Sequence, residues 1–244
     1  MKALVFAAGL GTRLKPITDS IPKALVEVGG KPLLHHVISK LKAAGFDEVV
    51  VNVYHFAQAV TDYIHGQDDF GIKIDISDES GFIRDTGGGM LYARDYLEGE
   101  PFLIHNVDIL SNLDLGWFMS QARPDALSNI LVSERETQRY FLFDDDMRLV
   151  GWMNTATKEV RTPFFNLNVS KCRKYAFGGI HYVTGNIFDI FDEDGWNSKF
   201  SITDFYVREC YARPIYGIVP EDLRLVDVGK PETLKTAGDF LGLA

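Results

Sequence analysis

Residues 6–16 read FAAGLGTRLKP, and this stretch decides how the rest of the chain is interpreted. It overlaps the end of an apolar run, Ala3–Ala8, that has the length and composition of a buried strand. The glycines Gly9 and Gly11 let the backbone turn tightly and approach a ligand, because no Cβ stands in the way. Arg13 places a cation beside that backbone. The stretch therefore predicts a strand followed by an anion-binding loop, and we expect a nucleoside triphosphate there.

Two common phosphate motifs do not fit this stretch. Gly9-x-Gly11 lacks the third glycine of the G-x-G-x-x-G fingerprint, which counts against a Rossmann-type oxidoreductase. A Walker loop would end in Gly-Lys-Ser or Gly-Lys-Thr, and the sequence has neither. Pro22-Lys23 instead adds a fixed turn and a second cation. Glycines alone are also typical of a plain strand-to-helix turn, whereas glycines, Arg13 and Pro22-Lys23 in this order are more specific.

Length and composition indicate a folded α/β protein. The chain has 244 residues, of which 46% are hydrophobic and 24% charged, enough for a substantial core. Its net charge of −9 argues against general nucleic-acid binding, which needs a basic face. Cys172 and Cys210 are too few for a zinc site or a disulfide framework. No apolar stretch approaches the roughly 20 residues that span a bilayer, so we expect a cytoplasmic protein without a membrane partner.

Strand and helix patterns alternate through the first half of the chain. Apolar residues at helical spacing predict helices over residues 33–44, 56–64, 90–97 and 113–122. Apolar or alternating runs predict strands over residues 48–53, 72–76 and 101–106. We therefore expect an α/β fold with a Rossmann-like, mixed but mainly parallel central sheet and helices on both faces. The ligand should bind where the strands end at their carboxyl edge.

The hydrophobic pattern changes after about residue 127. Strands are predicted over residues 127–133, 140–143, 149–152 and 177–183, and helices over residues 202–211 and 233–241. The acidic trio 144–146 is interpreted as a hairpin turn, not as a metal site. Because no Pro-, Gly- or Ser-rich linker divides the chain, we expect one domain over residues 1–244.

The glycine stretch resembles the signature of the sugar-phosphate nucleotidyltransferases, L-A-x-G-x-G-T-R-L-x-P-x-T followed by P-K-x-L. Here the signature reads FAAGLGTRLKPIT and then PKAL. The resemblance continues to Asp227-Val228-Gly229, so it covers essentially the whole chain. It implies that a nucleoside triphosphate (NTP) and a sugar 1-phosphate are joined with release of pyrophosphate. The short N-acetylmuramate 1-phosphate uridylyltransferases and mannose 1-phosphate guanylyltransferases are the types it resembles most.

The same resemblance implies a Mg²⁺ site made by two carboxylates. Asp108 follows the strand that ends at Asn106 and matches the family's metal-binding aspartate. Asp227 matches the aspartate of W-x-D-V-G-T-P-E, although this chain has Leu225 for Trp and Lys230 for Thr. Mg²⁺ commonly takes one or two carboxylates and completes its shell with water and substrate phosphates.

The resemblance also divides the chain between two substrates. The first half, about residues 1–126, would bind the nucleotide, and the second, about residues 127–244, the sugar phosphate. The residues that would bind the nucleotide are Ala8, Gly9, Gly11, Thr12, Arg13 and Gly88. Lys23 and Gly179 would bind the sugar phosphate. The family's E-K-P lysine has no clear counterpart, and Lys158 and Lys171 are candidates by elimination.

In a reaction of this kind the main tasks of the protein are to position the two phosphates and to neutralise their negative charge. The attacking phosphate oxygen is ionised at neutral pH, so no general base is required. Arg13 would stabilise the departing pyrophosphate, and Lys23 would bridge the α-phosphate and the incoming phosphate. Two alternatives stay open: a phosphocholine cytidylyltransferase of the same fold, and a nucleotide-binding regulatory protein without catalysis. The base, the sugar and the oligomeric state are not determined by the sequence.

Overall fold

The computed structural model describes residues 1–242. The strands are β1 (Lys2–Phe6), β2 (Glu27–Val28), β3 (Lys31–Pro32), β4 (Glu48–Val53), β5 (Lys73–Asp78), β6 (Phe102–Asn106), β7 (Ile109–Ser111), β8 (Ser128–Ser133), β9 (Arg139–Phe143), β10 (Leu149–Asn154), β11 (Val160–Arg161), β12 (Arg173–Val183), β13 (Ile215–Ile218) and β14 (Leu225–Asp227). The α-helices are α1 (Leu33–Ala43), α2 (Ala57–Gly66), α3 (Asp85–Tyr92), α4 (Arg94–Leu97), α5 (Leu115–Ser120), α6 (Ile187–Glu193), α7 (Ile202–Glu209) and α8 (Pro231–Phe240).

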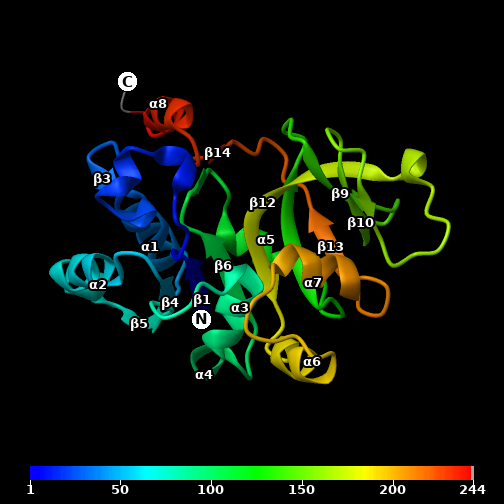
Figure 1. Ribbon diagram of the computed structural model, residues 1–244, viewed down its shortest axis with the longest axis horizontal. Coiled ribbons are helices and arrows are strands. Elements are labelled where there is room, and N and C mark those ends of the chain that lie inside the picture. Colours follow the sequence, from blue (N-terminus) through cyan, green and yellow to red (C-terminus); the bar gives the residue numbers. More distant parts are fainter. Residues whose placement is uncertain (243–244) are drawn as a thin grey trace.

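A ten-stranded sheet runs through both halves of the chain. Its main path is β11-β10-β9-β12-β6-β1-β4-β5, and β8 and β13 extend it beside β12. Strands β5, β4, β1 and β6 are parallel, and β12 pairs antiparallel with β6, β8 and β9. Figure 1 shows the long strand β12 joining the two halves. The predicted mixed sheet is confirmed, and β5 lies at one end of its path.

Helices cover both faces of the sheet, as predicted. Side chains alternate along a strand, so Ala3 and Val5 of β1 face one core and Leu4 and Phe6 face the other. The first core is completed by helices α1, α2, α5 and α8. The second is completed by helices α3, α4, α6 and α7. Within residues 1–242, no helix combines the length and the hydrophobicity that crossing a membrane requires.

Several elements differ from the sequence prediction. The glycines Gly87–Gly89 were expected to lead into a helix that begins at Met90, but they lie inside helix α3. Glycine is a poor helix former, yet each of these three packs closely against a neighbouring group. Helix α6 and strand β13 were not predicted at all. The hairpin of β9 and β10 around residues 144–146 is confirmed, and Cys172 and Cys210 are both free thiols.

Two fully buried histidines make the stability of the fold depend on pH. Burial lowers the pKa of His181 to about 3 and that of His105 to about 4. The unfolded chain therefore binds more protons than the folded chain below about pH 6.5. We expect the free energy of unfolding to fall by about 1.4 kcal/mol per pH unit for each histidine as the pH drops from 6.5 toward 4.

Urea unfolding at a series of pH values measures this slope. His181→Phe removes one titrating group and should make the slope shallower by about 1.4 kcal/mol per pH unit. A free energy of unfolding that is constant between pH 6.5 and 4.5 would contradict this account.

Candidate functional site

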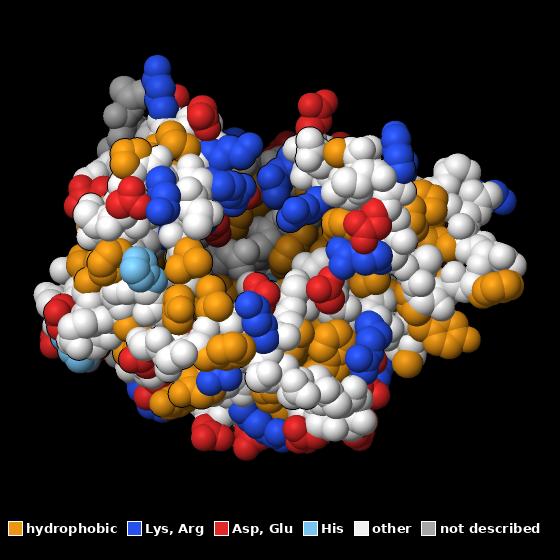
Figure 2. Space-filling model, viewed as in Figure 1, with side chains coloured by type: hydrophobic (Ala, Val, Ile, Leu, Met, Phe, Trp, Pro, Cys, Tyr) orange, Lys and Arg blue, Asp and Glu red, His pale blue; other side chains and the backbone are white. Residues whose placement is uncertain are grey.

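A large cleft opens between the two halves of the molecule. Its volume is about 1620 Å³. It is lined by Arg13 after β1, by residues at and just after the end of β6, by residues of β12, and by residues within the segments 135–161, 201–204 and 225–236. Figure 2 shows Lys and Arg side chains gathered around the mouth of this hollow. The cleft lies at the carboxyl edge of the parallel strands, where α/β sheets bind their ligands.

The two aspartates predicted to bind a metal lie together at one end of this cleft. Strand β14 pairs antiparallel with β7, so that Asp227 stands opposite Ile109, the residue after Asp108. The backbone N–H of Val228 also donates to the Asp108 carbonyl oxygen at 2.8 Å. A two-strand ladder thus joins residues that are 119 positions apart in the sequence.

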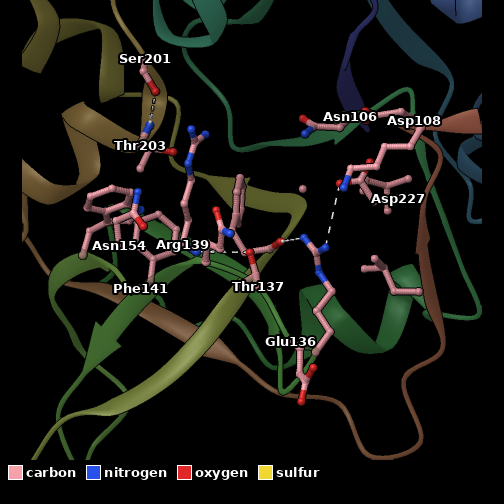
Figure 3. A pocket seen from close by; sticks show the side chains of 18 of the residues that line it. Asn106, Asp108, Glu136, Thr137, Arg139, Phe141, Asn154, Ser201, Thr203 and Asp227 are labelled. Carbon is pink, nitrogen blue, oxygen red and sulfur yellow. Dashed lines mark hydrogen bonds and ion pairs between the residues drawn. The ribbon is translucent and has the colours of Figure 1, made fainter. Parts of the chain in front are cut away.

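Three cations surround the two carboxylates. Lys23 Nζ donates to Asp108 Oδ2, and these two side chains are only 10% and 17% exposed. Arg135 approaches Asp227 Oδ2 at 4.0 Å and donates to the Phe177 carbonyl oxygen at 3.2 Å (Figure 3). The third cation is Arg13, which projects from the glycine loop into the cleft.

Gly229 marks where Arg13 meets Asp227. A Cβ added at Gly229 would lie 2.6 Å from an Arg13 guanidinium nitrogen and 2.7 Å from Asp227 Oδ1. Both groups therefore occupy the space that a side chain would need. The glycine of the Asp227-Val228-Gly229 element is thus required by close packing at the site.

Burial and the nearby cations act in opposite directions on the pKa of Asp227. Burial, followed by the nearby Asp108 carboxylate, raises the pKa of Asp227. Lys23, Arg135 and Arg13 act in the opposite direction on this pKa. Asp227 Oδ1 is nonetheless buried without a hydrogen-bond partner in the described part of the chain. A hard divalent cation would satisfy this oxygen and relieve the repulsion between the two carboxylates.

The two carboxylates suit Mg²⁺ better than a metal ion whose ligands all come from the protein. Within residues 1–242 no group of three or more His, Cys, Asp or Glu side chains is placed to hold an ion. Two carboxylates and an open cleft instead match an ion that keeps waters and substrate oxygens in its shell. The residues present therefore fit a substrate-sharing Mg²⁺ site.

The glycine loop has the tight backbone that its sequence predicted. Gly11 adopts a left-handed conformation with φ +62°, and its carbonyl oxygen accepts a hydrogen bond from Thr18 Oγ1 at 2.8 Å. A Cβ at Gly11 would lie 2.8 Å from Thr18 Cγ2. Of the predicted nucleotide-binding residues in this loop, Arg13 lines the cleft. Roles for Ala8, Gly9, Gly11 and Thr12 stay predictions.

The two other predicted binding glycines occupy different surroundings. Gly179, with φ +72°, lines the cleft and packs against Asn106 at an irregular pairing of β12 with β8. Gly88 is buried in helix α3, and its N–H donates to the Phe200 carbonyl oxygen at 3.1 Å. That N–H is therefore already engaged. The proposed contact of Gly88 with the nucleotide stays a prediction.

The sequence interpretation missed the arginines of the second half. Arg135, Arg139 and Arg161 line the cleft. Lys158, in the turn between β10 and β11, and Lys171, in a short 3₁₀ turn, are not among its lining residues within the described chain. An R-x-T-x-R spacing at residues 135–139 is the signal that could have identified two of them, because alternate residues of an extended segment face the same way.

Figure 3 shows that the cleft has two ends with different side chains. Asp108 and Asp227 lie at one end, and Ser201, Thr203 and Asn154 lie at the other. At this second end the Arg161 guanidinium stacks 3.8 Å from the centre of the Trp152 ring. The site therefore combines an acidic, cation-binding end with a larger polar and aromatic end.

The chain is thus an α/β protein with a glycine loop, two carboxylates and several cations at the carboxyl edge of its sheet. The family model described as "Nucleotidyl transferase" matches residues 2–143, more than half of the chain. The chain therefore belongs to the nucleotidyl transferase family, and the resemblance found in the sequence is confirmed.

Two curated relatives are similar to part of the chain. The N-acetylmuramate alpha-1-phosphate uridylyltransferase of Neisseria meningitidis is 40% identical over 114 residues, which cover 47% of this chain and 49% of the relative. Mannose-1-phosphate guanylyltransferase 1 of Arabidopsis thaliana is 40% identical over 119 residues, which cover 47% of this chain and 33% of the relative. The matches thus span half or less of each relative.

A solved structure is similar over the whole fold. The crystal structure of HddC from Yersinia pseudotuberculosis has a TM-score of 0.78 and is 22% identical in sequence. The alignment covers 98% of this chain and 99% of that one. The similarity supports the fold assignment for both halves.

Gly229→Ala tests whether Arg13 and Asp227 form one binding site. The added methyl group should displace the guanidinium or Asp227 Oδ1 and weaken Mg²⁺–NTP binding about tenfold or more, since charge-assisted hydrogen bonds contribute roughly 1.5–3 kcal/mol. Calorimetric titration with UTP and GTP in the presence of Mg²⁺ measures the affinity.

Gly238→Ala in helix α8 is the matched control. No atom lies within 4 Å of the added Cβ, and alanine is favoured over glycine in a helix. This variant should bind the nucleotides like the wild type. A Gly229→Ala protein with unchanged affinity would show that nucleotides bind elsewhere.

Proposed function

We propose that this chain transfers a nucleotidyl group from an NTP to a sugar 1-phosphate and releases pyrophosphate. The observation that carries the proposal is the meeting of Asp108 and Asp227 with Lys23, Arg13 and Arg135 at one end of a two-ended cleft. Family membership supports the reaction type. The second end has room and polar groups for an acceptor.

Asp108 and Asp227 would hold Mg²⁺ in this reaction. When bound, the ion would supply positive charge to the phosphate oxygens around the reacting α-phosphorus. Asp227 Oδ1, buried without a protein partner among the described residues, is the atom best placed to bind it.

The chain's own cations would position the two phosphates. An oxygen of the sugar phosphate attacks the α-phosphorus, and the bond from that phosphorus to the oxygen bridging it to the β-phosphorus breaks. Pyrophosphate leaves with the electron pair, and Arg13 offsets its charge. Arg135, held by the Phe177 carbonyl oxygen and by Asp227, lines the cleft and would orient the acceptor phosphate. Lys23 would move from Asp108 toward the phosphates when the metal takes the carboxylate.

The second end of the cleft favours a sugar phosphate over phosphocholine. A quaternary ammonium group would need an open aromatic face. The Arg161 guanidinium already covers Trp152, and Arg161 also pairs with both Asp204 and Glu159. Asp204 and Glu159 are thus already paired, and the nearby arginine would repel a second cation.

A pyrophosphate-release screen tests the reaction. UTP with N-acetylmuramate 1-phosphate and GTP with mannose 1-phosphate are the first pairs, because the relatives are named for these substrates. We expect Mg²⁺-dependent release for at least one pair of NTP and sugar 1-phosphate, and none with phosphocholine. Chelation of the metal should abolish release.

Asp108→Asn and Asp227→Asn separate an enzyme from a nucleotide-binding regulator. Each should lower pyrophosphate release by about 100-fold or more, because the metal then loses a charged ligand. Asp125→Asn, at an exposed carboxylate outside the cleft, is the control and should be fully active. A wild-type protein that binds NTP but releases no pyrophosphate with any acceptor would favour the regulator.

Arg135→Ala tests the assignment of the acceptor phosphate. We expect the KM for the sugar 1-phosphate to rise about tenfold or more and the KM for NTP to change much less, because a charged hydrogen bond to one substrate is lost. Arg173→Ala, on β12 outside the cleft, should change neither KM. An equal rise in both KM values would instead place Arg135 on the nucleotide.

A further inference from the structure

A buried amide and a buried carboxylate lie directly behind the glycine loop. Asn52 is at the end of β4 and Glu79 follows β5, and each is 2% exposed. Asn52 Nδ2 donates to Glu79 Oε1 at 2.7 Å. Burial raises the pKa of Glu79, and the Asn52 hydrogen bond opposes that rise. Burying a carboxyl group at this depth costs free energy that hydrogen bonds must offset.

The pair fixes the first peptide groups of the loop. Asn52 Oδ1 accepts hydrogen bonds from the backbone N–H of Ala7 at 2.7 Å and of Ala8 at 3.3 Å. These amides lie just beyond the end of β1, where the sheet ladder stops. Their orientation decides the path of the backbone toward Gly9 and Arg13.

The pair also contacts the start of helix α3. Glu79 Oε2 accepts from the Arg84 N–H at 3.3 Å. A Cβ at Gly89 would lie 2.6 Å from Glu79 Oε1 and 2.8 Å from Asn52 Nδ2, so only glycine fits over the pair. The Asn52–Glu79 pair thus holds both the glycine loop after β1 and the start of helix α3, the two segments that the family resemblance assigns to the nucleotide.

The other side of helix α3 is fixed to the acceptor half. The N–H groups of Gly87 and Gly88 donate to the Phe200 carbonyl oxygen, and the Ile202 N–H donates to Thr86 Oγ1. The glycine loop is therefore connected through Asn52, Glu79 and α3 to the start of α7, next to the cleft residues 201–204.

We propose that Asn52 and Glu79 are positioning residues for the nucleoside triphosphate, acting through the Ala7 and Ala8 amides. The proposal rests on the proposed nucleotidyl transfer, because it assigns the loop to the NTP. Within the described residues 1–242 neither Asn52 nor Glu79 is a lining residue of the cleft, and so the pair would set nucleotide affinity through the loop backbone. The acceptor should be affected much less.

Exchanging the Asn52 amide and the Glu79 carboxylate tests whether the pair positions the NTP. Asn52→Asp alone places two carboxyl groups in contact and should raise the KM for NTP about tenfold, while the KM for the sugar 1-phosphate stays within about twofold. Adding Glu79→Gln restores every hydrogen bond of the pair. The bond between positions 52 and 79 forms again, with residue 79 now the donor. The new carboxylate still accepts from the Ala7 and Ala8 N–H groups, and the new amide donates to it and accepts from Arg84. The double variant should return the KM for NTP to within about threefold of the wild type.

Ser77→Ala is the matched control. Ser77 lies opposite Asn52 on β5, is equally buried, and its Oγ has no hydrogen-bond partner among the described residues. It should leave both KM values unchanged. Glu79→Gln alone keeps the bond with Asn52 but loses the acceptor for Arg84, and should have a smaller effect than Asn52→Asp.

Calorimetric NTP binding without an acceptor separates this proposal from the proposed function. If the wild type binds NTP but releases no pyrophosphate, the transfer reaction is wrong, and the order of NTP affinities among the variants still tests the pair. Parallel changes in both KM values, or a double variant without rescue, would overturn the positioning role. A wild type that binds no NTP would overturn both proposals.

Discussion

The site depends on keeping Asp108 and Asp227 close together. The β7–β14 ladder imposes this proximity, because Asp227 stands opposite Ile109 and the Val228 N–H binds the Asp108 carbonyl oxygen. Two carboxylates at such a position repel each other and lose hydration. The Lys23 ion pair offsets part of this cost, and Asp227 Oδ1, which has no hydrogen-bond partner among residues 1–242, is the atom that we propose binds a metal ion.

The rest of the fold brings to that pair the groups that we propose bind the polyphosphate. Strand β1 lies between β4 and β6, so the loop after it opens at the middle of the sheet edge. Strand β12 continues the sheet into the second half, whose arginines face the same cleft. One continuous sheet thus holds the proposed NTP end and the proposed acceptor end of the cleft together, which would suit a reaction governed by the alignment of two phosphates.

The strands and helices that follow local, periodic hydrophobic patterns could be predicted from the sequence. The range of β4 was predicted to the residue, and the order of strands and helices in the first half gave the mainly parallel sheet and its carboxyl edge. Asp108 and Asp227 were found through motifs, yet their meeting depends on a pairing of distant strands that no local pattern reveals. The helix predicted over residues 90–97 left out Gly87–Gly89, whereas tertiary contacts with Phe200, Ser198 and Glu79 require glycine at these positions inside helix α3. The cleft arginines were missed because Arg135 and Arg139 lie at a loop and a strand start whose burial and partners come from the fold.

The most direct measurement is the fate of the α-phosphorus of the NTP. Wild-type protein would be incubated with Mg²⁺, the active sugar 1-phosphate, and NTP labelled with ³²P at either the α or the γ position. The account predicts that the α label appears in the nucleotide sugar and the γ label in pyrophosphate. A γ label recovered as orthophosphate or on the sugar, with the α label left in a nucleoside diphosphate, would contradict it.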